Sequence, residues 1–265
     1  MHSSLFQGLV LIEPVIQETI PPGKHTALLT TFRADHWDSL EDARSYFTSN
    51  KFFMSWDPRA LEKYVQYGTR RTPTTLYPHA NTNAVTLKTT KAQEAWTILR
   101  PNFSARPLEG DLTLEEQMKT VGYTTDETRF LFHRPEAGAA FRLLPILQPS
   151  VKWIFGSRSY INLPETRGAK VENTAKALRG NGTISADTIA EGGHMVPLER
   201  IPETAQIVAS YIEEQLEEFA KKKAFWESHD SGKSDPSKLR LSERWKDAVR
   251  QKPDMLRPVL EKGKL

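Results

Sequence analysis

The chain has 265 residues, of which 38% are hydrophobic and 26% are charged, so it can bury a sizeable core and wholesale disorder is excluded. The absence of cysteine excludes a disulfide scaffold, a zinc–thiolate or iron–sulfur site and a cysteine nucleophile. No apolar run approaches the roughly 18–20 residues of a membrane span, and the N-terminus lacks the basic start of a signal peptide, which predicts a soluble intracellular protein.

The net charge of +3 is distributed unevenly along the chain. From Lys221 to Leu265 there are 13 Lys and Arg residues against 7 Asp and Glu, whereas the preceding residues hold 23 against 26. A basic tail of this kind can attract nucleic acid or anionic lipid. It has no interleaved aromatic residues at the spacing of a nucleic-acid platform. We therefore expect a solvated, partly helical extension and no nucleic-acid partner.

Two short apolar runs predict buried parallel strands. Gly8–Ile12 is rich in branched residues and ends at Glu13-Pro14, where proline cannot donate to a central ladder. Val151–Phe155 is the second run. Thr183–Ser185 is a weaker strand candidate farther along the chain.

The section between the two strong strand candidates has a helical pattern. Apolar residues recur at three- and four-residue spacing over Leu40–Asn50 and Pro58–Tyr67, and Asp57 is a capping acid before the first-turn proline. The stretch Ala84–Lys88 is too weakly patterned to assign. We expect most of the clustered aromatic residues to form a core and some to line an apolar pocket: Phe47, Phe52, Phe53, Trp56, Tyr64 and Tyr67.

Two more helices are predicted after the second strand. One covers Val171–Leu178, and a strongly amphipathic one runs from about Pro202 to Ala220. Strands alternating with helices predict an α/β fold class in which the long helical section is inserted between two strands of one sheet.

His194 is the residue whose setting points most clearly to chemistry. It follows two glycines, which permit a close approach of the chain, and it precedes the last predicted helix of the sheet region. A histidine on such a loop suits a general base that reaches a neighbouring site, and the alternative is a histidine that caps the helix. The other six histidines have no comparable setting.

The segment Gly192–Glu199 resembles the catalytic-histidine loop of α/β-hydrolases. Gly8–Val15 is similar to the sixth strand of that fold and Trp153–Ser159 to the seventh. The middle section, including Phe52–Arg59, is similar to the helical cap of fungal hydrolases from toxin and secondary-metabolite pathways. The resemblance implies the C-terminal portion of an α/β-hydrolase sheet with a large helical cap insertion, lacking the N-terminal half of the fold.

The resemblance also implies a division of the chain into four regions. Residues 1–21 would hold the sixth-strand region, 22–147 the helical cap, and 148–220 the last strands and helix with the histidine loop. Residues 221–265 would form the basic tail.

The same family uses a serine nucleophile on a Gly-x-Ser-x-Gly turn, an acid and a histidine. No Gly-x-Ser-x-Gly pattern occurs in the chain, and only seven residues precede Gly8, so the nucleophile is expected to be missing. Many members carry the acid after the seventh strand, where this sequence has Ser159. Others carry it after the sixth strand, where Glu13 is the preferred candidate to orient His194. Glu165 and Asp187 are weaker candidates.

The resemblance is strongest to the acyl-CoA thioesterases of mycophenolic-acid-type fungal pathways, which implies hydrolysis of an acyl-CoA or ester substrate and no metal or organic cofactor. Gly263, Lys264 and Leu265 resemble the peroxisomal address Ser-Lys-Leu, which would make an import receptor a partner and place the protein in the peroxisome rather than the cytoplasm. Two alternatives stay open. One is a catalytically inactive, truncated hydrolase that acts as a binding protein or does not fold alone, and its exposed sheet edge could lead to self-association. The other is an ester, lactone or epoxide hydrolase.

Overall fold

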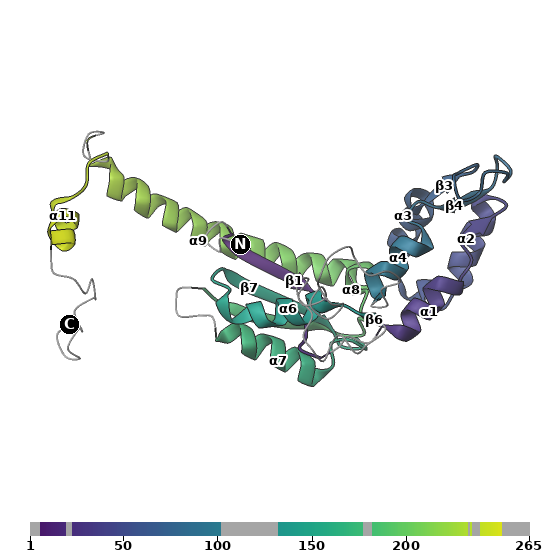
Figure 1. Ribbon diagram of the computed structural model, residues 1–265, viewed down its shortest axis with the longest axis horizontal. Coiled ribbons are helices and arrows are strands. Elements are labelled where there is room, and N and C mark those ends of the chain that lie inside the picture. Colours follow the sequence, from purple (N-terminus) through teal and green to yellow (C-terminus); the bar gives the residue numbers. More distant parts are fainter. Residues whose placement is uncertain are drawn as a thin grey trace, which may run out of the picture. The chain divides into compact units, whose positions relative to one another are not determined.

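The computed structural model describes residues 6–19, 23–101, 132–176, 182–232, 234 and 239–250. The chain divides into two compact units, Met1–Glu213 and Glu214–Leu265. The first unit contains a parallel sheet with its helices and, inserted between two strands of that sheet, a cap of helices and short strands (Figure 1).

The central sheet is parallel and has the order β1-β7-β8. Its strands are β1 (Gly8–Ile12), β7 (Ser150–Gly156) and β8 (Ile184–Ile189). In the register, Leu11 lies opposite Trp153, and Ile154 lies opposite Asp187. The structure confirms both strong strands and their parallel pairing, but β1 is half-buried along its length rather than buried.

Helices cover both faces of this sheet, as its alternating side chains require. On one face, α6 (Pro135–Leu143), the short turn η4 (Leu144–Ile146) and α7 (Pro164–Ala175) contribute side chains to a core centred on Trp153. On the other face, residues near the start of α9 (Ile201–Ser231) pack against Ile154 and its neighbours. Figure 1 shows α7 and α9 on opposite sides of the strands.

The cap has its own aromatic core. Phe47, Phe53 and Trp56 are buried, and Tyr64 packs against them. The expectation that these aromatic residues form a core is therefore confirmed for most of the set, whereas Phe52 and Tyr67 are exposed. The elements are α1 (Lys24–Phe32), β2 (His36–Trp37), α2 (Leu40–Ser49), η2 (Phe53–Ser55), α3 (Pro58–Gly68), β3 (Thr69–Arg71), β4 (Val85–Leu87), α4 (Lys91–Ile98), β5 (Arg100–Pro101) and β6 (Phe132–His133).

The helix predictions for the cap are confirmed to within about one residue. Ser39 caps α2 by accepting from the Asp42 N–H, and Asp57 caps α3 with Pro58 at its first position. The unassigned stretch holds β4, which pairs with both β2 and β3 in an antiparallel sheet.

Three element boundaries differ from the prediction by four residues or more. Helix α7 begins at Pro164, seven residues before the predicted start, because Pro164 takes the first-turn position and the buried side chains of the helix are mostly polar. Strand β8 extends to Ile189. The sequence does not predict this extension because most exposed positions of the strand carry polar side chains and Ile189 is its one buried residue. Helix α9 continues eleven residues beyond Ala220.

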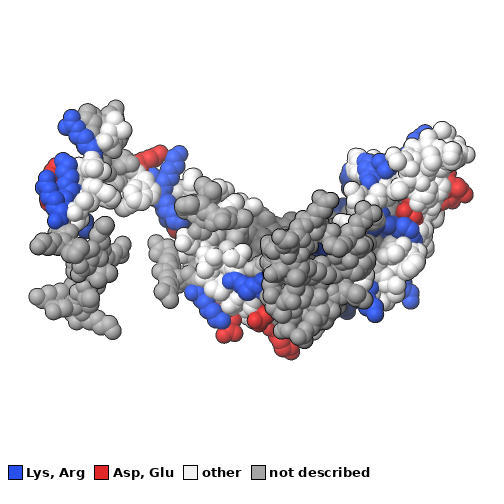
Figure 2. Space-filling model, in the orientation of Figure 1, with Lys and Arg blue, Asp and Glu red and all other residues white. Residues whose placement is uncertain are grey.

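The second unit contains the end of α9 and the helix α11 (Glu243–Arg250). Every residue of α11 is exposed. Cations outnumber acidic residues on α11, which Figure 2 shows at the left with its Lys and Arg side chains in blue. In the described ranges, no helix is long and apolar enough to cross a bilayer. The proposed address Gly263, Lys264 and Leu265 lies outside the described residues.

Candidate active site

Glu13 lies directly after β1 and is only 4% exposed. Its backbone φ is 46°, in the left-handed region that non-glycine residues adopt at a cost of about 1–2 kcal/mol. A hydrogen bond from its N–H to the Ile154 carbonyl, at 2.9 Å, holds this conformation against the neighbouring strand. The strained turn directs the carboxylate across the end of β7 instead of along the strand.

The Glu13 carboxylate accepts four hydrogen bonds. Oε1 accepts from the Gly156 N–H at 2.6 Å. Oε2 accepts from the Ser159 hydroxyl and from the Asn162 amide, both at 2.7 Å, and lies 3.2 Å from His194 Nδ1. The two predicted residues, 181 positions apart in the sequence, therefore lie within hydrogen-bond distance of each other.

This arrangement fixes the tautomer of a neutral His194. An ionised carboxylate can only accept, so Nδ1 carries the proton that it donates to Glu13. Nε2 is then the unprotonated nitrogen. A histidine oriented in this way can take a proton at Nε2 while the carboxylate stabilises the resulting imidazolium.

The environment of Glu13 favours its ionised form. Burial alone raises the pKa of this carboxyl, but hydrogen bonds from His194, Ser159, Asn162 and the Gly156 N–H outweigh burial and bring the pKa below its ordinary value of 4.5. Glu13 is therefore a carboxylate at neutral pH although it is buried.

The other acidic candidates lie elsewhere. Asp187 forms an ion pair with Lys152 at 2.5 Å on the sheet, and Glu165 is exposed in the first turn of α7. Ser159, at the usual position of the acid after the seventh strand, instead donates its hydroxyl proton to Glu13. Among these four residues, the structure brings only Glu13 to His194.

The histidine loop crosses the end of β7 at very short range. The Arg158 N–H donates to the Gly192 carbonyl at 2.8 Å. A Cβ atom on Gly156 would lie 2.4 Å from both the Gly192 and the Gly193 carbonyl oxygens, closer than real Cβ atoms approach. Glycine is therefore required where the strand passes under the loop, and the pair of glycines before His194 is part of the same close approach.

We expect Gly156→Ala to lower the free energy of unfolding by about 1–3 kcal/mol, because the added methyl group must push the histidine loop away from β7. Urea unfolding followed by circular dichroism measures the change. Gly168→Ala is the matched control, since nothing lies within 4 Å of its Cβ position on α7 and alanine there should stabilise by about 0.5–1 kcal/mol. Equal effects of the two substitutions would contradict the close approach.

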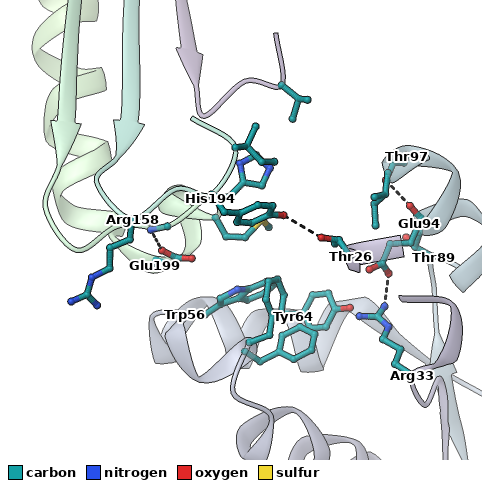
Figure 3. Close-up of a pocket in the computed structure, with 18 of the residues that line it drawn as sticks. Thr26, Arg33, Trp56, Tyr64, Thr89, Glu94, Thr97, Arg158, His194 and Glu199 are labelled. Carbon is teal, nitrogen blue, oxygen red and sulfur yellow. Dashed lines mark hydrogen bonds and ion pairs between the residues drawn. The ribbon is translucent and has the colours of Figure 1, made fainter. Parts of the chain in front are cut away.

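His194 lines a cavity of about 620 Å³ that lies between the sheet and the cap (Figure 3). The cap side of this cavity carries the aromatic residues Phe52, Phe53, Trp56 and Tyr64. The remaining lining residues are Val15, Thr26, Arg33, Thr89, Glu94, Thr97, Ile98, Arg134, Arg158, Tyr160, Ile161, Gly193, Met195 and Glu199.

Polar groups sit at fixed places in this wall. Arg33 forms an ion pair with Glu94 on the cap, and the Thr26 hydroxyl meets the Tyr160 hydroxyl at 3.4 Å across the cavity. Figure 3 shows Trp56 and Tyr64 on the opposite side of the cavity from His194. The cavity is mainly apolar with a few polar groups, as ligand sites usually are.

The cap contacts the histidine loop directly. The Asp57 N–H donates to the Leu198 carbonyl of α8 (Val196–Glu199) at 2.8 Å. Met195 and Leu198 pack against the aromatic core of the cap. The loop that carries His194 and the helix that follows it are therefore held on one side by β7 and on the other by direct contacts with the cap.

No model of a known protein family matches the chain. The type I acyl-CoA thioesterase mpaH of Penicillium roqueforti is 29% identical over 282 aligned residues, which cover 96% of this chain and 63% of that protein. The peroxisomal alpha-beta-hydrolase Lpx1 of Saccharomyces cerevisiae superposes with a TM-score of 0.53 and 15% identity, over 88% of this chain and 58% of that one. The chain has the α/β-hydrolase fold.

A second group of relatives comes from another fungus. The abhydrolase domain-containing protein AFT2-1 of Alternaria alternata is 23% identical over 217 residues, which cover 79% of this chain and 74% of that protein. The chain spans less than two thirds of the length of mpaH and of Lpx1. No Gly-x-Ser-x-Gly pattern occurs among its 265 residues.

The candidate site contains residues that the sequence did not reveal. Asn162 and Lys170 are completely buried beside Glu13, and neither belongs to a recognisable pattern. The buried side of α7 is formed by Lys170, Asn173 and Thr174, so no apolar pattern in the sequence sets Lys170 apart. Among the described residues, no group of three or more His, Cys, Asp or Glu side chains has the arrangement of a metal site.

Proposed function

We propose that the chain supplies the acid–base half of a serine-type hydrolase that cleaves acyl-CoA thioesters. The observation that carries this proposal is the pairing of His194 Nδ1 with Glu13 Oε2 at 3.2 Å on the wall of a 620 Å³ cavity. In this proposal the serine nucleophile comes from a segment outside these 265 residues.

The chemistry of the proposed pair follows from the tautomer. As the serine hydroxyl attacks the thioester carbonyl, His194 Nε2 takes the hydroxyl proton, and it delivers that proton to the departing thiolate. Nε2 then removes a proton from water, whose oxygen attacks the carbonyl of the acyl-enzyme. The bond between the acyl group and the serine oxygen breaks, Nε2 returns the proton to that oxygen, and the free acid leaves. Glu13 holds the imidazole of His194 in its orientation and stabilises its cationic form in both steps.

The cavity and the relatives support the substrate class. An aromatic wall formed by Phe52, Phe53, Trp56 and Tyr64 suits a bulky apolar acyl group. The relative mpaH is named a type I acyl-CoA thioesterase. We place the substrate among the acyl-CoA intermediates of fungal secondary metabolism, of the mycophenolic acid kind.

Thioesterase assays on two chains test this proposal. The 265-residue chain should be inactive, and a chain extended upstream to include a Gly-x-Ser-x-Gly segment should hydrolyse an aromatic or long-chain acyl-CoA. A panel of esters, lactones and epoxides assayed in parallel separates the related chemistries. An extended chain that hydrolyses no acyl-CoA would overturn the substrate assignment.

A second candidate function is a binding role without catalysis. It is favoured by the position of β1 at one end of the described sheet order, because an edge strand can pair with a further strand. In that role another strand, from a second copy, pairs with the free edge of Gly8–Ile12. Sedimentation analysis of the 265-residue chain separates the two candidates, since edge pairing predicts a dimer. Slow hydrogen exchange through both β1 and β7 would show in addition that the sheet is stable in this chain.

We also propose a peroxisomal location, from the terminal residues Gly263, Lys264 and Leu265, with an import receptor as partner. Lpx1, a structural neighbour of the same fold, is a peroxisomal hydrolase by name. Deletion of the three residues from an N-terminally tagged chain should move the protein from peroxisomes to the cytoplasm. An unchanged distribution on fluorescence imaging would contradict the proposal.

A further inference from the structure

Lys170 is a lysine in an unusual place. It lies on α7 and is 0% exposed, although lysine is almost never fully buried unless it is paired. Burial is the main reason why its pKa falls from 10.5 to about 8, with the negative charge of Glu13 acting in the opposite direction. Burial of this ammonium group costs free energy of desolvation, so the contacts that it makes inside the fold are the place to look for its role.

The ammonium group of Lys170 donates two hydrogen bonds, and each acts on Glu13 through an intermediate group. Nζ donates to the side-chain carbonyl of Asn162 and, at 2.9 Å, to the main-chain carbonyl of Pro14. The second contact fixes the chain one residue after Glu13, where the φ of 46° makes the backbone strained.

The contact with Asn162 has a directional consequence. An amide group presents a carbonyl on one side and an NH₂ on the other, and its two orientations differ little in shape. The ammonium group of Lys170 requires the carbonyl on its own side, so the NH₂ must face the Glu13 carboxylate, to which it donates at 2.7 Å. A flipped amide would set NH₂ against ammonium and carbonyl against carboxylate.

We propose that Lys170 is the positioning residue that keeps the Glu13 carboxylate ionised and aimed at His194. It acts through Asn162 and through the Pro14 carbonyl, and it contacts neither the cavity nor a reacting atom. This inference rests on the proposed role of Glu13, but its test requires no catalysis.

Other charged groups surround this chain of contacts. Glu13 faces Lys170 from the end of β1, and His194 lies beyond Glu13 on the loop before α8. Arg167, three residues before Lys170 on α7, donates to the Asn162 carbonyl of the main chain at 2.5 Å and to the Ser157 carbonyl at 3.3 Å. Arg167 therefore anchors the backbone of Asn162, while Lys170 orients its side chain.

The first experiment titrates Glu13 in the 265-residue chain by ¹³C NMR of its side-chain carboxyl carbon. Lys170→Met should raise the pKa of Glu13 by about one unit, a tenfold change in proton affinity. Asn162→Leu should also raise it, and the double variant should show no rise beyond that of Asn162→Leu if the lysine acts chiefly through the amide. The hydrogen-bonded Nδ1–H resonance of His194 should weaken in Lys170→Met.

Lys152→Met is the matched control. Lys152 is also a largely buried lysine of the first unit, with 16% of its side chain exposed, and it pairs with Asp187. This substitution should leave the pKa of Glu13 and the His194 Nδ1–H resonance unchanged. A Glu13 titration in Lys170→Met that matches wild type, or that shifts equally in Lys152→Met, would overturn the proposal and leave Lys170 with a purely structural role.

A second measurement uses the unaltered protein, so it does not depend on the folding of a variant. When Lys170 loses its proton near pH 8, the Glu13 carboxyl carbon and the Asn162 side-chain amide should shift in the same step. An absence of that step at both nuclei, while Lys170 itself titrates, would contradict the coupling. These readouts are independent of thioesterase activity, so failure of the substrate assignment and failure of this inference are distinguishable.

Discussion

Replacing His194 with alanine is expected to lower kcat/KM for an acyl-CoA by about 10⁴-fold or more, in a chain extended to carry the serine nucleophile. The imidazole is the group that the structure places between the Glu13 carboxylate and the cavity, so its loss removes the proposed base while leaving the cavity wall otherwise intact. Single-turnover assays of acyl transfer and product release measure the effect.

Substitutions around the same pair sharpen this test. Glu13→Gln keeps the shape of the side chain, but its amide can donate to the imidazole and favour the wrong tautomer, so a similar loss is expected. The double variant should be no worse than His194→Ala alone, since the two residues act as a unit. His79→Ala, at an exposed histidine of the cap, is the matched control and should be fully active. Activity of His194→Ala close to wild type would rule out the proposed base.

Replacing Trp153 with alanine is expected to lower the free energy of unfolding by about 3–5 kcal/mol. Trp153 is 0% exposed in the middle of β7, where it lies between Leu11 of β1 and Ala186 of β8 in the register. It also stacks on Phe155 with ring centroids 5.7 Å apart. Its removal leaves a cavity at the centre of the sheet, and small domains are stable by only about 5–15 kcal/mol.

Urea unfolding followed by far-ultraviolet circular dichroism measures this loss without depending on tryptophan fluorescence. Trp96→Ala on α4 is the matched control, because that side chain is 63% exposed and its loss should change stability by less than about 0.5 kcal/mol. Trp153→Phe, with a smaller expected loss, keeps the comparison possible if the alanine variant does not fold. Equal losses at Trp153 and Trp96 would contradict the assigned core.

The sheet could be predicted where apolar residues are continuous. Val151–Phe155 is buried on both faces except at the half-buried Lys152, and Gly8–Ile12 is half-buried along its whole length, so neither strand shows an alternation of buried and exposed residues. Strand β8 was predicted four residues too short at its end because polar residues occupy most of its exposed positions. The start of α7 was missed because its buried face contains Lys170, Asn173 and Thr174 rather than aliphatic residues.

The candidate site could be predicted only in part, and the reason is again physical. Glycines and a proline flank His194 and Glu13, and these residues leave a mark in the sequence because they restrict or free the backbone. The contacts of Asn162 and Lys170 with Glu13 and Pro14 join residues about 150 positions apart. Such pairs depend on how α7 packs against the sheet, which no local pattern encodes.

The insertion of the cap between β1 and β7 bears on the order in which the chain folds. These strands are neighbours in the sheet although 137 residues separate Ile12 from Ser150. If that segment were flexible, bringing its ends together would cost about 4 kcal/mol in loop entropy. The aromatic core of the cap forms within residues 37–87 and therefore closes only short loops. We expect the cap to fold first and to shorten the effective loop, so that strand pairing, and with it the meeting of Glu13 and His194, comes late.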